Sequence, residues 1–238
     1  SLRDKFRPKL NACLELNNKA YNFLGKLMAS AISTGEVLDL NLHPIVWKGI
    51  LGNTLTLEDY KSIDFTFYNL INQLEDEYRN KSFENLYNLN FVIKKSNEVD
   101  EELKPNGSEI NVNLNNLREY IDLCKKIRLN EFSSQIENIK QGFYSVLSEN
   151  MLQVLNWKQV DELVCGKNKI NVEDFKKHTS YEDYNKNDEV IKWFWEWFEE
   201  CGDEKQVMYL KFVSGRSRLP RSGRFDYKHL LKVYGNSL

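Results

Sequence analysis

Hydrophobic residues recur at helical spacing near the start of the chain. The apolar positions fall on one face from Ala20 to Thr34, where Gly35 favours a helix end. The residues on this face are Leu24, Leu27, Met28, Ala31 and Ile32. This pattern predicts one long amphipathic helix.

Two shorter helices are predicted next. Thr56 can cap free backbone amides, and Asp59 stands at capping-box spacing three residues later. Another helical period begins near Asp64. Its apolar face would carry Phe67, Ile71 and Leu74.

Short β-strands are predicted in the middle of the chain. Residues 89–93 and 110–112 have strand-like composition, and a polar stretch at 96–102 and a turn at 104–107 separate them. We therefore expect a small sheet in this region.

Helical periodicity returns in the second half. Residues 117–127 and 136–147 predict a long helix or a broken pair. The polar, glycine-led stretch 166–169 can act as a connector whose backbone angles change. Beyond it, residues 190–198 and 207–212 predict further helices. The expected fold class is mainly α with small β elements (α+β).

The composition limits the classes of partner. Hydrophobic residues make up 41% of the 238 positions, and 33 basic against 35 acidic residues give a net charge of -2. This balance provides no overall attraction to nucleic acid or to an anionic membrane. No apolar run approaches the roughly eighteen residues that span a bilayer, and the first residues do not resemble a signal peptide. We expect an intracellular protein, cytoplasmic or nuclear, without membrane insertion.

The cysteines and histidines indicate no metal and no cofactor. Cys13, Cys124, Cys165 and Cys201 are far apart and form no C-x-x-C pair, so reduced thiols are expected. The three histidines are isolated in the sequence. Basic residues crowd the last part of the chain, where we expect a solvated or carboxylate-paired surface and no nucleic-acid site; they are Arg216, Arg218, Arg221, Arg224, Lys228 and Lys232.

An ordered series of short motifs runs through almost the whole chain. In chain order the motifs are Gly25-Lys26-Leu27-Met28, Val46-Trp47-Lys48, Leu57-Glu58-Asp59-Tyr60, Lys104-Pro105-Asn106-Gly107, Arg118-Glu119-Tyr120-Ile121, Gln141-Gly142-Phe143, Cys165-Gly166, Phe194-Trp195-Glu196 and the run from Lys211 to Pro220. Their order and spacing resemble the catalytic domain of HECT-type ubiquitin ligases. The run Gly215-Arg216-Ser217-Arg218-Leu219-Pro220 looks closest to the HERC-type members.

The resemblance implies a bilobal HECT architecture. A helical N-lobe would span residues 1–166 and include a small subdomain, at about 53–124, that binds the ubiquitin-conjugating enzyme. A hinge would follow at 167–170, with a partial α/β C-lobe at 171–238. Gly166, Lys167, Asn168 and Lys169 are the implied hinge residues.

The resemblance also implies a reaction. A HECT ligase accepts ubiquitin from a conjugating enzyme as a cysteine thioester and transfers it to substrate lysines. The family nucleophile lies in a loop of the form Leu-Pro-x-x-x-Thr-Cys, and Tyr234 to Leu238 looks like the approach to that loop. The catalytic cysteine is therefore implied just beyond Leu238, and the fragment would be inactive alone. The alternative is a catalytically inactive HECT-like scaffold or binding module.

Partner sites are implied at matching positions. The conjugating enzyme would dock at Phe67, Ile71, Leu74, Leu89, Tyr120 and Cys124. The spacing of the first three is also that of any buried helix face, so burial in a core is the competing interpretation. Tyr68 and Ile139 match a second, non-covalent ubiquitin site of some relatives. Substrates would be chosen by regions outside this domain.

Overall fold

The computed structural model describes residues 14–84, 88–152, 154–167, 169–219 and 229–232. The expectations for Cys13, Asn168 and the approach to Leu238 lie outside the described residues. Contacts divide the chain into two compact units, which we describe separately. The first unit contains residues 1–27 and 41–153, and the second contains residues 28–40 and 154–238. The lobe boundaries implied by the sequence stay a prediction.

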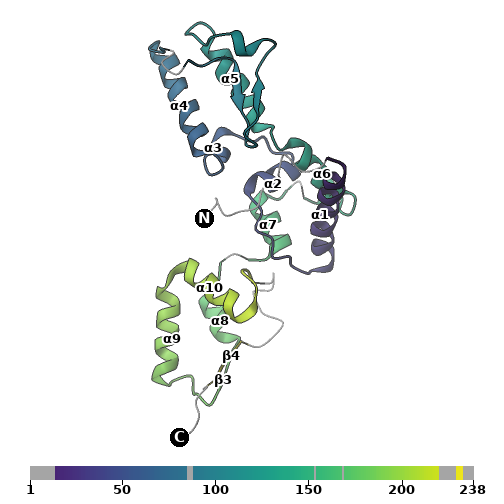
Figure 1. Cartoon of the computed structure of the whole chain (residues 1–238). Helices are drawn as coiled ribbons and strands as arrows, with labels where there is room; N and C mark the ends of the chain where they lie inside the picture. The colour runs from purple at the N-terminus through teal and green to yellow at the C-terminus, as the bar shows by residue number, and fades with distance from the viewer. Residues whose placement is uncertain (1–13, 85–87, 153, 168, 220–228, 233–238) are drawn as a thin grey trace. The chain divides into compact units, whose positions relative to one another are not determined.

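Helices dominate both units, and the strands are short (Figure 1). The first unit holds α2 (Pro44–Ile50), α3 (Leu57–Tyr60), α4 (Phe65–Asn80), β1 (Val92–Lys94), β2 (Asp100–Glu102), the 3-10 turn η2 (Gly107–Glu109), α5 (Leu117–Leu129), α6 (Ser133–Tyr144) and η3 (Glu149–Met151). The second holds α7 (Trp157–Cys165), α8 (Val172–Lys177), β3 (Thr179–Glu182), α9 (Glu189–Glu200), α10 (Gly202–Ser214) and β4 (His229–Lys232). Helix α1 (Leu14–Thr34) is divided between the units after Leu27. The predicted mainly α fold with small β elements is confirmed.

The predicted helix starts coincide with caps. Thr56 and Asp59 form a capping box at the start of α3. The carboxylate of Asp64 accepts a hydrogen bond from the backbone N–H of Phe67 at 2.9 Å, which caps α4. The long first helix ends at Thr34, as expected, and the predicted helical region at 117–147 is a broken pair, α5 and α6.

The predicted small sheet is present with a different second strand. Strand β1 pairs antiparallel with β2, and Ile93 stands opposite Glu101. The prediction of a strand at 110–112 was wrong, because that segment contributes only an isolated bridge between Asn90 and Asn111. Strand β2 has the sequence Asp-Glu-Glu, without apolar alternation, so its pairing comes from backbone hydrogen bonds in a hairpin that the side chains do not indicate.

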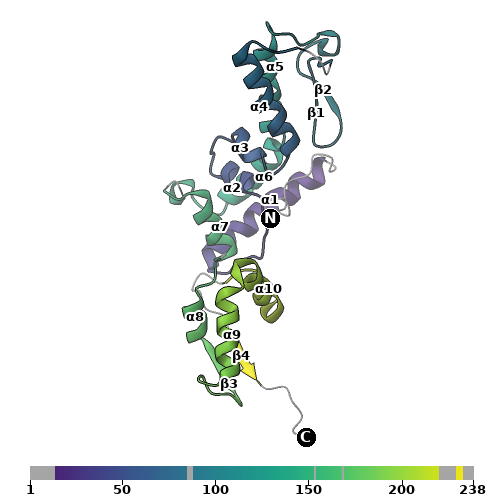
Figure 2. The same cartoon turned by 90° about the vertical axis from the view of Figure 1, so that its left-hand side faces the viewer.

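One core of the first unit fills the space between α4, α5 and the hairpin of β1 and β2. Figures 1 and 2 both show α4 and α5 side by side with the hairpin next to them. Ile71, Phe91 and Ile121 have no exposed surface. Burial of such side chains stabilises a fold by about 1.5–3 kcal/mol each. This core therefore holds the three elements around which the candidate site is built.

The backbones of α1 and α6 approach each other closely at two glycines. A Cβ atom at Gly25 would lie 2.0 Å from the carbonyl oxygen of Ile139, and one at Gly142 would lie 1.9 Å from that of Asn22. Both distances are far below van der Waals contact, and the obstructing atoms are backbone. The glycines are therefore required for this helix pair.

Replacing Gly142 with alanine should destabilise the first unit by about 1–3 kcal/mol, because the added methyl group forces the helices apart. Hydrogen exchange of the α6 amides, followed by mass spectrometry, measures this loss. Ser134→Ala is the matched control, since Ser134 is exposed on the same helix and the change should stay within about 0.5 kcal/mol. Equal protection of α6 in both variants would contradict the close-packing argument.

The second unit has its own aromatic core and a two-stranded sheet. Strands β3 and β4 pair in parallel, with Thr179 opposite His229. The core gathers side chains from α8, α9 and α10, and its fully or nearly fully buried members are Ile170, Phe175, Ile191, Trp195, Phe198, Leu210 and Leu219. The predicted helices at 190–198 and 207–212 are confirmed, whereas α7, α8 and both strands were not predicted from the hydrophobic pattern.

Candidate functional site

A groove of about 420 Å³ opens in the first unit beside the core. Helix α4 forms one side and part of the floor, α5 forms the rest of the floor, and β1 with the hairpin tip forms the other side. Its apolar lining consists of Ile63, Phe67, Leu70, Ile71, Val92, Ile93, Tyr120 and Cys124. The polar lining consists of Asp64, Thr66, Lys94, Lys95, Ser96, Glu98 and Arg128. An apolar floor with a charged rim suits the anchor side chain of a protein partner.

Four of the six predicted docking residues line this groove. Phe67, Ile71, Tyr120 and Cys124 do so, although each is at most 8% exposed and also belongs to the core. Leu74 and Leu89 are not among the lining residues. Leu74 is 1% exposed, and Leu89 is half-buried against the same core. Both interpretations of the helix face therefore apply, because the side chains form the core and their edges form the groove floor.

Sequence reasoning missed the accessible part of the groove. Thr66 is exposed and Leu70 is half-buried, and both lie on the groove side of α4. Leu70 had a detectable signal, since it stands three residues after Phe67 on the same helical face. Lys94 and Glu98 had none, because the groove wall at the hairpin tip depends on the strand pairing that was not predicted.

The thiol on the groove floor is inert. Cys124 is 2% exposed, and burial raises its pKa to about 12. Burial likewise raises the pKa of Tyr120, whose hydroxyl contacts that thiol. Because a protonated thiol is a poor nucleophile, the groove offers binding and no covalent chemistry at neutral pH.

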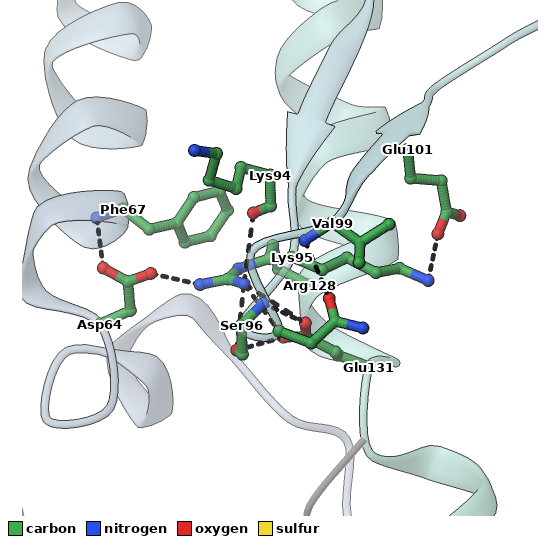
Figure 3. A network of polar contacts seen from close by, with 10 residues as sticks. Asp64, Phe67, Lys94, Lys95, Ser96, Val99, Glu101, Arg128 and Glu131 are labelled. Atoms are coloured by element: carbon green, nitrogen blue, oxygen red, sulfur yellow. Dashed lines mark hydrogen bonds and ion pairs between the residues drawn. The ribbon is translucent and has the colours of Figure 1, made fainter. Parts of the chain in front are cut away.

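A buried arginine joins the two sides of the groove (Figure 3). The guanidinium of Arg128 pairs with Asp64 at the start of α4 and with Glu131, whose carboxylate oxygen lies 3.1 Å away. It also donates to the hydroxyl of Ser96 at 3.1 Å, and it lies 5.1 Å from the ring centroid of Phe67. The side chain of Arg128 is only 3% exposed.

Glu131 completes this network from the turn after α5. Its carboxylate accepts hydrogen bonds from the backbone N–H of Ser96 at 2.6 Å and from the Ser96 hydroxyl at 2.8 Å. At the hairpin, Lys95 pairs with Glu101. Figure 3 shows these side chains converging between α4 and the hairpin tip. The network therefore holds the hairpin tip and the start of α4 at a set separation, which defines the groove width.

The two residues of the predicted second ubiquitin site differ in accessibility. Tyr68 is half-buried on α4, and its hydroxyl donates to Glu58 at 2.8 Å. Ile139 is 1% exposed in α6, so its side chain is not offered to a partner here. The second ubiquitin site stays a prediction.

The described hinge residues follow directly after α7. Gly166 caps the helix, and Lys167 forms an isolated antiparallel bridge with Leu219. Lys169 is exposed. Of the basic residues near the end of the chain, Arg218 pairs with Asp161 and Lys232 with Glu182, whereas Arg221, Arg224 and Lys228 lie outside the described residues.

The described cysteines lack the features of an acyl-transfer nucleophile or a metal site. Burial, with the nearby Asp161 carboxylate, raises the pKa of Cys165 to about 12. Cys201 is half-buried, and its thiol donates to backbone oxygens. Within the described ranges there is no cluster of three potential metal ligands. None of the helices searched there is long and apolar enough to span a membrane.

Comparison with known proteins gives a consistent result. A profile of the HECT-domain (ubiquitin-transferase) family matches residues 3–234. The E3 ubiquitin-protein ligase pub1 of Schizosaccharomyces pombe is 31% identical over 87% of this chain and 27% of its own length. Human NEDD4 is 30% identical over 92% of this chain and 17% of its own length. Human HERC2 is 30% identical over 87% of this chain and 4% of its own length. HERC2 and NEDD4 thus have the same identity to this chain, and the chain spans less than a third of each relative.

Proposed function

Because this chain belongs to the HECT-domain (ubiquitin-transferase) family, we propose that its groove docks a ubiquitin-conjugating enzyme and that the protein containing it is a ubiquitin ligase. The observation that carries the proposal is the groove itself. It combines an aromatic and aliphatic floor with an accessible rim in the region where the family resemblance implies donor docking. The partners are a conjugating enzyme, ubiquitin and substrate proteins.

The physical fit concerns one protruding apolar side chain of the partner. The ring of Phe67 and the side chain of Tyr120 line the floor, and Leu70 and Val92 flank the opening. An anchor inserted there would be surrounded by apolar surface and shielded from water by the rim. Such buried anchors supply most of the binding free energy of a protein interface.

The reaction that we propose consists of two acyl transfers. A cysteine thiolate of the ligase attacks the carbonyl carbon of the thioester that joins ubiquitin to the conjugating enzyme, and the enzyme's thiolate leaves. The amine of a substrate lysine then attacks the new thioester, loses a proton and releases the ligase thiolate. The buried, protonated state of Cys124 and Cys165 supports a nucleophile other than these two. The position beyond Leu238 stays a prediction, as does a cytoplasmic or nuclear location.

The alternative is a scaffold that docks the donor without accepting ubiquitin. A thioester assay on the full-length protein separates the two, because a ligase gives a ubiquitin adduct that a reductant removes. Docking with no such adduct, for any charged donor, would favour the scaffold. If the protein neither docks a donor nor forms an adduct, both the ligase and the scaffold hypotheses are contradicted.

Replacing Thr66 with tryptophan should weaken binding of the conjugating enzyme at least about tenfold, equivalent to ~1.4 kcal/mol. Thr66 is exposed at the groove edge, so the indole would fill the groove without entering the core. Titration calorimetry of this chain against a panel of purified conjugating enzymes measures the effect.

Gln73→Trp is the matched control for this experiment. Gln73 is exposed on the same helix but is not a groove residue, so the same bulky side chain should leave affinity unchanged. Equal affinity of wild type and Thr66→Trp for a donor that does bind would place the docking surface elsewhere.

A further inference from the structure

The segment after α10 returns to the end of α7 and pairs with it. The backbone N–H of Lys167 donates to the carbonyl oxygen of Leu219 at 2.9 Å, and the N–H of Leu219 donates to that of Lys167 at 3.1 Å. All of these residues belong to the second unit. The connector after α7 is thus paired with a second segment of the chain, although the sequence predicts only a connector whose backbone angles can change.

A buried ion pair lies next to this bridge. Arg218 donates to the carboxylate of Asp161 at 2.9 Å, and their side chains are 9% and 5% exposed. The same nitrogen of Arg218 lies 3.4 Å from the carbonyl oxygen of Gly166. A charge removed from water needs such a partner, so separating the pair inside the protein is unfavourable.

Gly166 allows the two strands to lie this close. Its φ is +83°, and a Cβ atom there would stand 2.1 Å from the carbonyl oxygen of Leu219. The returning strand therefore passes directly over a residue that has no side chain.

A third anchor ties the returning strand to the segment after α1. The hydroxyl of Ser217 donates to Asp39 at 2.5 Å. The neighbouring Leu38 N–H donates to the carbonyl oxygen of Val164 in α7 at 2.9 Å. Residues 217–219 are consequently bound to two other segments by side-chain and backbone contacts.

We propose that residues 217–219 and the end of α7 form a two-stranded joint closed by the Asp161–Arg218 ion pair. Two chain segments that cross at the same place restrict a rotation about the connector that a single segment would allow. While the joint is closed, the segments that the predicted hinge connects can only bend about it. They can rotate freely only after the ion pair opens. The second carboxylate oxygen of Asp161 is buried without a hydrogen-bond partner in the described part of the chain, so the closed state is incompletely satisfied.

Cys165 is a built-in probe for this opening. Its side chain is 1% exposed beside the ion pair, and its thiol is protonated at neutral pH because its pKa is about 12. Cys124 in the first unit is similarly buried, at 2% exposure, with the same pKa of about 12. The two thiols are similarly buried, have similarly raised pKa values and lie in different units.

The experiment is pulse labelling with N-ethylmaleimide at neutral pH, with each cysteine quantified by peptide mass spectrometry. In the wild type, Cys165 and Cys124 should both react slowly. Arg218→Met removes the cation of the ion pair, and because the Arg218 guanidinium lowers the pKa of Cys165, its loss without opening of the joint could only slow labelling. Opening of the joint should instead speed labelling of Cys165 at least about tenfold without changing Cys124. Lys232→Met, which removes an exposed ion pair of the same unit, should change neither thiol.

Two outcomes would overturn the joint. The first is wild-type Cys165 reacting as fast as the half-buried Cys201. The second is Arg218→Met also removing hydrogen-exchange protection from α9, because the ion pair would then stabilise the whole unit. Protected α9 amides with a reactive Cys165 would support the joint. This inference does not depend on the proposed ligase activity.

Discussion

Replacing Arg128 with methionine is expected to destabilise the first unit by about 3–5 kcal/mol, the usual cost of removing one partner from a buried ion pair. The substitution leaves Asp64 and Glu131 facing each other without a cation, and the Glu131 side chain has no exposed surface. Hydrogen exchange of the α4 and α5 amides measures this loss, because a chain with two units need not unfold in a single transition.

Arg118→Met provides the control on the same helix. Arg118 pairs with Asp122 in solvent, with side-chain exposures of 54% and 53%, so its removal should cost less than about 1 kcal/mol. If the two variants lose protection equally, the buried network does not stabilise the groove. Thr66→Trp tests groove occupancy and Arg128→Met tests groove support, so their effects are separable.

Acid should destabilise the second unit through His229, by about 2 kcal/mol between pH 7 and pH 5. Burial lowers the pKa of His229 from its ordinary 6.5 to about 4. Thr179 donates its hydroxyl proton to the carbonyl oxygen of Phe175, so it accepts from Nδ1–H of the imidazole at 2.9 Å. Nε2 then accepts from the hydroxyl of Tyr209 at 2.8 Å, and this arrangement requires a neutral ring.

The direction of this pH effect on stability follows from the lowered pKa of His229 in the folded state. As the pH falls, the unfolded chain binds the proton first, so the stabilisation is complete above about pH 6.5 and is lost towards pH 4. Urea unfolding monitored by tryptophan fluorescence suits this test, since Trp157, Trp193, Trp195 and Trp197 lie in the second unit. His229→Gln should reduce the difference in unfolding free energy between pH 7 and pH 5. His178→Gln, at a partly exposed position, should leave that difference unchanged. An unchanged pH dependence in His229→Gln would exclude His229 as the cause.

Local side-chain signals predicted most of the helices. Thr56, Asp64 and Gly35 mark helix boundaries because caps and stops depend on adjacent residues. The face carrying Phe67, Ile71 and Leu74 was recognised for the same reason, since helical periodicity needs no distant partner.

Structure that depends on distant pairing was not predicted. Strand β2 forms through backbone hydrogen bonds to β1, and the Lys167–Leu219 bridge joins residues on opposite sides of three helices in the sequence. No local pattern records either pairing.

The candidate site shows the same division. Its floor was predicted from the helical faces of α4 and α5, together with the family resemblance. Its hairpin wall was not predicted. The roles of Arg128 and Glu131 were missed because a charged residue is usually at the surface. The implied donor-docking, second ubiquitin and hinge residues stay predictions.

The hairpin wall of the groove also affects how the partner preference of this domain can change in evolution. Because β2 pairs through its backbone, and Asp100 is exposed, substitutions of Asp100 should cost the fold little. The same holds for Glu98 at the tip, which lines the groove and is 81% exposed. Partner preference can therefore change through single substitutions on one wall while the floor stays constant. Duplicated copies of this domain could in this way acquire different donors without passing through an unstable intermediate.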